Sequence, residues 1–169
     1  MNLSKTSSPK KYSVTIRRAV KSDGKTLLYL INALADYEKL ARPDKAGCTR
    51  LLRDAFGKRK LFYVFLAFEG KTAIGYAIYY YTYSSFLALT TLYLEDLFVL
   101  PGYRKKRAGW KLFQACVREA KTQGCGRMEW MVLEWNKLAI DFYDRLGAKQ
   151  LDGWLPYRLE RIQFKKLLS

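Results

Sequence analysis

The chain has 169 residues, of which 50% are hydrophobic and 15% aromatic, enough for one well-buried core and short for two. It carries 31 Lys and Arg against 15 Asp and Glu, a formal net charge of +16, and it contains no His. The charge predicts attraction to nucleic acid, an anionic membrane or a phosphorylated cofactor, with a basic protein that has no such partner as an equal alternative. The lack of His excludes Ser-His and Cys-His catalysis and any imidazole metal site.

No uninterrupted run of 18 apolar residues occurs, so the sequence predicts no membrane span. Residues 1–11 are polar and basic, unlike a secretory signal, and we expect them to form a flexible arm before a single domain at 12–169. The cysteines Cys48, Cys116 and Cys125 show neither metal-ligand spacing nor a disulfide framework. They predict a reduced, cytoplasmic protein without a bound metal.

The N-terminal half combines short strands with two helices. Residues 12–20 alternate apolar and polar side chains as a strand does, and residues 21–40 have helical spacing after Ser22 or Asp23 as a cap. The other elements expected in this half are a helix at 48–56 ended by Gly57, two strands within 61–86 joined at Glu69-Gly70-Lys71, and a strand at 91–100 closed by Pro101-Gly102.

The C-terminal half starts with a helix at Ala108, whose apolar face consists of Leu112, Phe113, Cys116, Val117 and Ala120. A strand pattern follows at 127–135, and Asn136 is placed to cap a helix at 137–146 that presents Ala139, Phe142, Tyr143 and Leu146 on one face. Residues 151–167 are β-prone. The order β-α-α-β-β-β-α-β-α-β predicts an α/β fold with a mixed sheet, antiparallel in its N-terminal half.

Five basic side chains surround the turn between the strand ending at Leu100 and the helix beginning at Ala108: Arg104, Lys105, Lys106, Arg107 and Lys111. The first turn of a helix has unpaired N–H groups and a partial positive charge, so basic side chains there lower helix stability. A bound anion would offset that loss. We interpret the turn as an anion site, with a nucleic-acid patch and an ordinary solvated helix end as alternatives.

Two segments, "YLEDLFVLPGYRKKRAGWKL" and "VLEWNKLAIDFYDRLGA", carry a resemblance to a known family. They resemble the GNAT superfamily of N-acetyltransferases, and within it most closely the diamine (spermidine/spermine) N-acetyltransferases. The resemblance runs from about Ser13 to the region of Trp154. It implies a mostly antiparallel central sheet with a splayed parallel pair and flanking helices, acetyl-CoA as cosubstrate, and a homodimer.

The resemblance also implies a cofactor site. The superfamily motif Arg/Gln-x-x-Gly-x-Gly/Ala matches residues 104–109, with Arg107 in place of the inner glycine. If the turn requires positive φ, arginine has a steric cost there that glycine lacks, but its side chain adds a phosphate ligand. The implied cofactor-binding residues are Leu97, Phe98, Val99, Arg104, Lys105, Lys106, Arg107, Ala108, Gly109, Trp110, Asn136 and Ala139.

The catalytic residues implied by the resemblance are Glu95 and Tyr143. Tyr143 would protonate the departing thiolate, although on periodicity alone a tyrosine there is usually a core residue. Glu95 would help the amine lose its proton, and Tyr37, Glu38, Glu95 and Asp152 would bind the substrate. Because neighbouring strand residues point to opposite faces, we expect one of Glu95 and Asp96 to face inward or into a cleft.

The implied reaction is direct acetyl transfer in a ternary complex, with the Val99 N–H stabilising the oxyanion and no cysteine nucleophile. Ser84-Ser85-Phe86-Leu87 replaces an acid and a tryptophan of the polyamine enzymes, which favours a shorter amine such as a diamine or a lysine-like amino acid. Two alternatives remain open: a protein or peptide N-acetyltransferase, and a basic nucleic-acid-binding protein of the same fold without catalysis.

Overall fold

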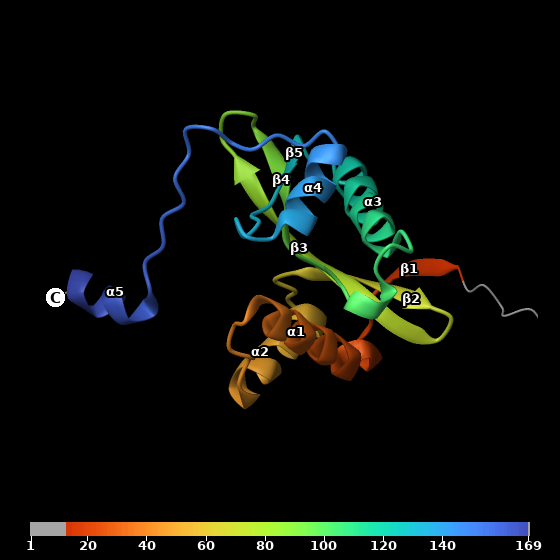
Figure 1. Cartoon of the computed structure of the whole chain (residues 1–169). Helices are drawn as coiled ribbons and strands as arrows, with labels where there is room; N and C mark the ends of the chain where they lie inside the picture. Colours follow the sequence, from red (N-terminus) through yellow and green to blue (C-terminus); the bar gives the residue numbers. More distant parts are fainter. Residues whose placement is uncertain (1–12, 169) are drawn as a thin grey trace, which may run out of the picture. The chain divides into compact units, whose positions relative to one another are not determined.

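The computed structural model describes residues 13–168 (Figure 1). The predicted arm at 1–11 lies outside the described residues. The chain divides between Met131 and Val132 into two compact units, and each unit is described by itself. The predicted single domain over 12–169 stays a prediction.

The first unit is built on a mixed sheet, as predicted. Within the described residues five strands pair in chain order, and only β4 and β5 are parallel. The strands are β1 (Val14–Arg18), β2 (Tyr63–Glu69), β3 (Thr72–Ser84), β4 (Leu89–Val99) and β5 (Arg127–Glu129). The predicted hairpin between β2 and β3 is confirmed, and Gly70 has the positive φ of 61° that this tight turn requires.

The parallel pair separates after a short contact. Strand β4 pairs with β5 only from Thr91 to Tyr93, and then continues to Val99. The predicted strand at 127–135 is therefore wrong beyond Glu129. Within the described part of this unit, the edge of β4 from Leu94 to Val99 faces no strand on the β5 side. The splayed pair predicted from the resemblance is present.

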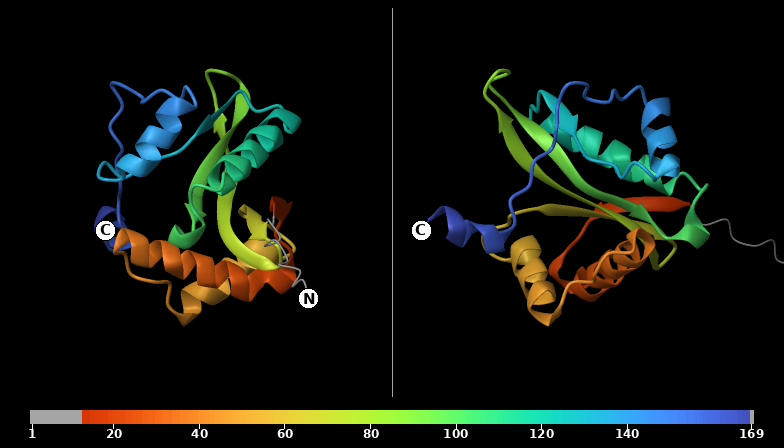
Figure 2. Two further views of the ribbon diagram at one scale, coloured as in Figure 1. Left: turned by 45° about the vertical axis from the view of Figure 1, so that its right-hand side comes forward. Right: turned by 60° about the vertical axis from the view of Figure 1, so that its left-hand side comes forward.

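Helices cover both faces of the sheet (Figure 2). The short 3₁₀ turn η1 (Lys21–Asp23), α1 (Gly24–Glu38) and α2 (Lys45–Phe56) lie on one face, and α3 (Ala108–Thr122) lies on the other after the 3₁₀ turn η2 (Pro101–Tyr103). Helix α2 begins before the predicted Cys48, because the Asp44 side chain caps it by accepting a hydrogen bond from Gly47 N. The core under α1 contains Leu27, Leu30, Ala55, Val64, Leu66, Tyr76, Ile78 and Phe98.

Helix α3 buries nearly the predicted face. Leu112, Phe113, Cys116 and Ala120 are buried, but Val117 is 43% exposed, so its assignment to the core is wrong. Ala115 and Glu119 are buried instead, because the apolar stripe is centred on Leu112 and Cys116 and Val117 lies beyond its edge.

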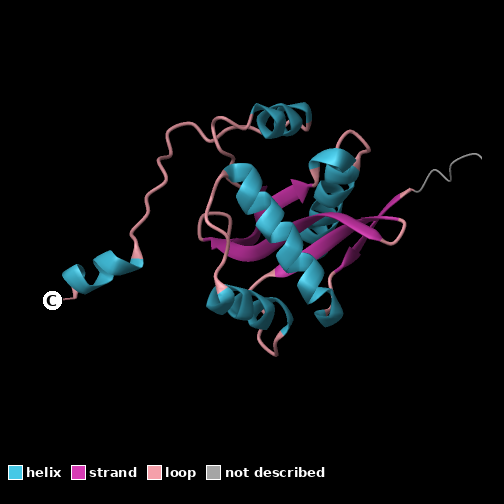
Figure 3. Ribbon diagram, turned by 60° about the horizontal axis from the view of Figure 1, so that its bottom comes forward, coloured by secondary structure: helices cyan, strands magenta, loops and turns pink. Residues whose placement is uncertain are grey.

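The second unit contains α4 (Lys137–Arg145) and α5 (Arg161–Leu167) (Figure 3). The Asn136 side chain accepts a hydrogen bond from Ala139 N at 3.3 Å, so the predicted N-cap of α4 is confirmed. The predicted β structure at 151–167 is wrong: the described tail is irregular up to Glu160 and then helical. The Gln163 side chain accepts from Glu160 N at 2.7 Å, a local cap that starts a helix where no partner strand is paired.

Candidate active site

An irregularity in β4 sets the direction of its two acids. Tyr79 pairs with Leu94 while Ile78 pairs with Asp96, so Glu95 is an extra residue, a β-bulge. The Tyr80 hydroxyl donates to Glu95 Oε2 at 3.3 Å. The expectation that one of the two acids faces inward is confirmed for Asp96, which accepts a hydrogen bond from the buried Tyr76, while Glu95 is exposed. The alternation on which this expectation rested does not hold here, because the bulge interrupts it. Glu95 and Asp96 both contact tyrosines of the face that α1 covers.

Asp96 is the most strongly perturbed acid of this face. The hydroxyl of Tyr76, a fully buried side chain, donates to Asp96 Oδ2 at 3.1 Å. Burial raises the pKa of Asp96 to about 6; the Tyr76 hydrogen bond opposes this rise, and the negative charges of Glu95 and Glu38 add to it. The pKa of this carboxyl group therefore lies near 6, and a cation that reaches the cluster would lower it.

The third carboxylate comes from the end of α1. Glu38 is the last residue of that helix, which stops because Lys39 adopts a left-handed conformation with φ of 58°. Burial raises the pKa of Glu38, and its charge acts on both Asp96 and Tyr76. We call Glu38, Glu95 and Asp96 the acid cluster.

The structure thus brings together three of the four predicted substrate positions, Tyr37, Glu38 and Glu95. The Tyr37 ring packs against Phe98, with the ring centroids 6.1 Å apart. Sequence reasoning missed Tyr76 and Tyr80 as members of the site, and it singled out the Glu95–Asp96 pair without assigning a role to Asp96. Their signal is the even spacing of the two tyrosines in "YAIYY", which places both on the same face of β3.

Three of the five basic side chains of the turn after β4 bind other groups of the protein. Arg104 Nε donates to the Val99 carbonyl oxygen at 3.0 Å, and Lys106 Nζ forms an ion pair with Glu69 at 2.9 Å. Lys111 Nζ donates to the Val14 carbonyl oxygen at 2.7 Å. The ammonium group of Lys106 is paired with Glu69, and its predicted role in cofactor binding stays a prediction.

Lys105 and Arg107 differ from the other three. Both have a φ of 63°, in the left-handed region that favours glycine, so the steric cost expected for arginine at the motif's inner glycine is present. Within residues 13–168, neither side chain forms a hydrogen bond or an ion pair. Two cations therefore remain available to an anion at this turn.

The first turn of α3 presents backbone N–H groups beside those cations. Ala108, Gly109 and Trp110 precede the first bond of the helix, which Lys111 N donates to the Arg107 carbonyl oxygen at 3.0 Å. A Cβ on Gly109 would lie 3.9 Å from Val99, which is ordinary contact. Unpaired amides, a helix N-terminus and two free cations suit a phosphate.

Leu97, Phe98 and Val99 lie on the part of β4 where its β5-side edge is open. They pair with Ala77, Tyr76 and Gly75 on the other side. A Cβ on Gly75 would lie 2.5 Å from the Phe98 carbonyl oxygen, so glycine allows the two strands to approach there. On its other edge, this part of the predicted cofactor-binding strand pairs with no strand of the described part of the unit, and the Val99 carbonyl oxygen accepts from Arg104.

Four predicted site residues lie in the second unit. Asn136 caps α4, Ala139 and Tyr143 are half-buried on α4, and Asp152 is exposed in a turn. The rings of Phe142 and Tyr143 pack edge to face, with centroids 5.3 Å apart. The roles of these four residues stay predictions.

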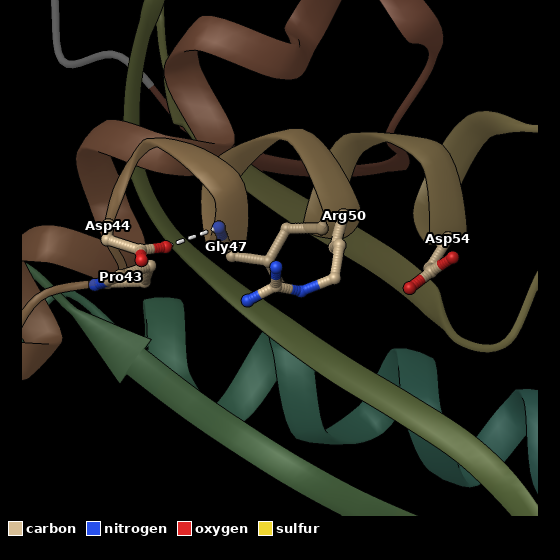
Figure 4. A pocket seen from close by; sticks show the side chains of 6 residues that line it. Pro43, Asp44, Gly47, Arg50 and Asp54 are labelled. Carbon is tan, nitrogen blue, oxygen red and sulfur yellow. Dashed lines mark hydrogen bonds between the residues drawn. The ribbon is translucent and has the colours of Figure 1, made fainter.

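A depression on α2 does not coincide with any of these features (Figure 4). It has a volume of about 480 Å³ and is lined by Pro43, Asp44, Gly47, Arg50, Leu51 and Asp54. The Asp44 carboxylate already caps Gly47 N there, as Figure 4 shows. Among the described residues, no group of three Cys, Asp or Glu side chains is arranged to hold a metal ion, and no helix combines the length and apolarity of a membrane span.

Residues 28–148 match the model of the acetyltransferase (GNAT) family. The chain belongs to this family. It is 34% identical to the thialysine N-ε-acetyltransferase of Mus musculus, over 92% of this chain and 97% of that protein. It is also 34% identical to the spermidine/spermine N(1)-acetyltransferase-like protein 1 of Homo sapiens, over 86% of this chain and 22% of that protein.

The fold of this GNAT member also occurs in solved structures. An aminoglycoside N-acetyltransferase in complex with CoA matches with a TM-score of 0.75 and 20% identity, over 91% of this chain and 99% of that chain. The predicted family, the mixed α/β fold and the assignment as an N-acetyltransferase that acts on amines are confirmed. Family membership also supports acetyl-CoA as the acetyl donor.

Proposed function

We propose that this protein transfers the acetyl group of acetyl-CoA directly to a primary amine of a small cationic substrate, a diamine, a polyamine or a lysine-like amino acid. The observation that carries the proposal is the acid cluster: three carboxylates from two elements on one face of the sheet, in a chain with a net charge of +16. Acids gathered in this way attract an ammonium group despite the basic surface. The names of the relatives, which act on thialysine and on spermidine or spermine, support the same class.

Within that class a shorter amine fits best. The tip between β3 and β4 reads Ser84-Ser85-Phe86-Leu87 and contributes no carboxylate. A long polyamine would leave its far ammonium group without a partner at this tip. A diamine or a lysine-like amino acid is short enough to place both of its ammonium groups within reach of the acid cluster.

In the proposed reaction, Glu95 accepts the proton of the substrate ammonium, directly or through water. The amine nitrogen then attacks the acetyl carbonyl carbon, and the Val99 N–H stabilises the oxyanion. The C–S bond breaks, and Tyr143 donates a proton to the thiolate. The amide nitrogen then loses its remaining extra proton to water, and a proton from water restores the Tyr143 hydroxyl. The unpaired first-turn amides of α3 and the free side chains of Lys105 and Arg107 would hold the phosphates of acetyl-CoA.

We also propose a cellular location and an oligomeric state for the enzyme. Three free cysteines support a reducing, cytoplasmic location. The side chains of Tyr83, Phe86, Leu87 and Leu89 at the tip between β3 and β4 are exposed, Phe86 by 98%, and a homodimer would cover such apolar groups.

The test is a turnover assay with acetyl-CoA against 1,3-diaminopropane, spermidine, thialysine, ornithine, a lysine peptide and a neutral primary amine. We expect release of thiol with the small dications, and a loss of about 100-fold or more in kcat for Tyr143→Phe with CoA affinity retained. Fastest turnover of the peptide would favour the protein N-acetyltransferase. A protein without CoA affinity that binds nucleic acid with a steep salt dependence would contradict the proposal.

A further inference from the structure

The cofactor turn and the acid cluster are in physical contact through one arginine. Arg104 is the first residue of the basic turn, and its guanidinium carbon lies 4.4 Å from the centre of the Tyr37 ring. Tyr37 directly precedes Glu38, the acid at the end of α1. A residue at the predicted phosphate site therefore stacks on the segment that carries a predicted substrate carboxylate.

The contact continues into the centre of the acid cluster. The Phe98 ring lies 5.8 Å from the guanidinium carbon of Arg104, 6.1 Å from the Tyr37 ring and 6.3 Å from the Tyr76 ring. Tyr76 in turn donates its hydroxyl proton to Asp96. The stack Arg104, Tyr37, Phe98 and Tyr76 thus forms an unbroken path of packed side chains from the turn to Asp96.

One nitrogen of the Arg104 side chain is fixed by the protein, and the other two can bind an anion. Its Nε donates to the Val99 carbonyl oxygen, while Nη1 and Nη2 form no hydrogen bond with the described residues. A guanidinium group is planar and presents its donors in a fixed fork, so a phosphate bound by the outer nitrogens also fixes the plane that stacks on Tyr37. A phosphate bound at the turn would therefore hold the guanidinium group in place on Tyr37, beside Glu38.

We propose that the stack of Arg104 on Tyr37 couples the two substrates, so that CoA bound at the turn raises the affinity of the acid cluster for the amine. The inference rests on the proposed function. Fixing the side chains of the stack has a free-energy cost that only the first ligand to bind meets, so the second ligand binds more tightly. Linkage requires the effect to be reciprocal: the amine raises the affinity for CoA by the same factor.

The test measures this factor by calorimetry in the complex of CoA and thialysine, in which no acetyl group is present to react. The dissociation constant of CoA is determined with and without saturating thialysine, and that of thialysine with and without saturating CoA. For the wild-type protein, we expect each ligand to lower the dissociation constant of the other by about fivefold or more, and by the same factor in both directions.

Variants separate coupling from binding. Tyr37→Leu removes the ring and should reduce the factor to about 1, whereas Tyr37→Phe keeps the ring and should keep the factor. Arg104→Lys keeps the charge but loses the planar fork, and should also reduce the factor. The matched control is Tyr29→Leu on the exposed side of the same helix, which should leave both affinities and the factor unchanged.

The outcomes are distinct. Tight but independent binding of the two ligands to the wild-type protein overturns the coupling and leaves the acetyltransferase proposal standing. A Tyr37→Leu protein that weakens one ligand and retains the wild-type factor overturns the role of the stack. A wild-type protein that binds neither ligand contradicts the proposed function, and the coupling with it.

Discussion

The two faces of the sheet surround a buried acid with different partners. On the α3 face, Glu119 accepts from Tyr81 at 2.7 Å and pairs with Arg18 at 2.5 Å, and Gln123 donates to it at 3.3 Å. On the α1 face, Asp96 has a tyrosine and two other carboxylates as neighbours. Glu119 pairs with a cation of the protein, whereas Asp96 pairs with none among residues 13–168.

The pKa shifts follow this difference. Burial opposes ionisation of Glu119, but the hydrogen bonds from Tyr81 and Arg18 outweigh it and lower its pKa. Burial raises the pKa of Asp96 to about 6, and its acidic neighbours act in the same direction. A closed network is a structural element of the core, whereas acids without a cation indicate a place where the ligand supplies the positive charge.

The largest expected difference between the two faces is the effect of removing an acid on catalysis. Glu95→Gln should lower kcat for amine acetylation between about 100-fold and 10,000-fold at an unchanged melting temperature, because it removes the group that accepts the ammonium proton. Steady-state kinetics with acetyl-CoA measures this loss.

The matched control on the other face is Glu119→Gln, which removes the same charge. It should lower the free energy of unfolding by about 1–3 kcal/mol, since Arg18 and Tyr81 lose a charged partner, and leave kcat of the folded protein unchanged. Equal losses of kcat in the two variants would break the comparison between the faces.

The pH dependence of stability should differ between the faces with opposite sign. Because the pKa of Asp96 is raised from 3.8 to about 6, the folded protein holds this proton more tightly than the unfolded chain, and stability falls as pH rises through this window. Glu119 has a lowered pKa, so its contribution is present above about pH 4.5 and is lost at lower pH.

Urea unfolding of the wild-type protein and of Asp96→Asn between pH 4 and pH 7 isolates the first effect. The stability of the wild-type protein relative to the variant should fall by up to about 3 kcal/mol across this range. A difference that stays constant with pH would place Asp96 in a solvated, unperturbed environment.

The smallest expected effect belongs to the turn between the faces. Arg107→Gly should raise the free energy of unfolding by about 1 kcal/mol, because glycine adopts the left-handed conformation without strain. It should also weaken CoA binding, since a free cation is lost.

Ala88→Gly provides the comparison for that variant, because Ala88 is also left-handed, with φ of 53°, at the tip between β3 and β4. It should gain similar stability without any change in CoA affinity. Unchanged CoA affinity in Arg107→Gly would show that its side chain has no part in phosphate binding.

Local signals made part of this structure predictable. The hairpin at Gly70, the start of α3 at Ala108 and the cap at Asn136 each depend on a few adjacent residues, and each is confirmed. The resemblance supplied the splayed sheet and the positions of Glu38 and Glu95.

The features that could not be predicted from the sequence are those that depend on how two elements pair or pack. The bulge at Glu95 is a property of the register between β3 and β4, so the common direction of Glu95 and Asp96 was not visible. The partners of the basic turn lie far away in the chain, as Glu69 does for Lys106 and Val14 for Lys111. The helix at α5 replaced a predicted strand because strand pairing, unlike a helix cap, requires a neighbour.

The central claim is that the acid cluster binds the amine. Calorimetric titration of thialysine into the CoA-saturated protein tests it most directly, with Glu38→Gln compared with Asp54→Asn, a surface acid on α2 that pairs with Arg53. We predict that Glu38→Gln weakens thialysine binding at least about tenfold, equivalent to about 1.4 kcal/mol, and that Asp54→Asn leaves it unchanged. Equal affinity in all three proteins would contradict the claim.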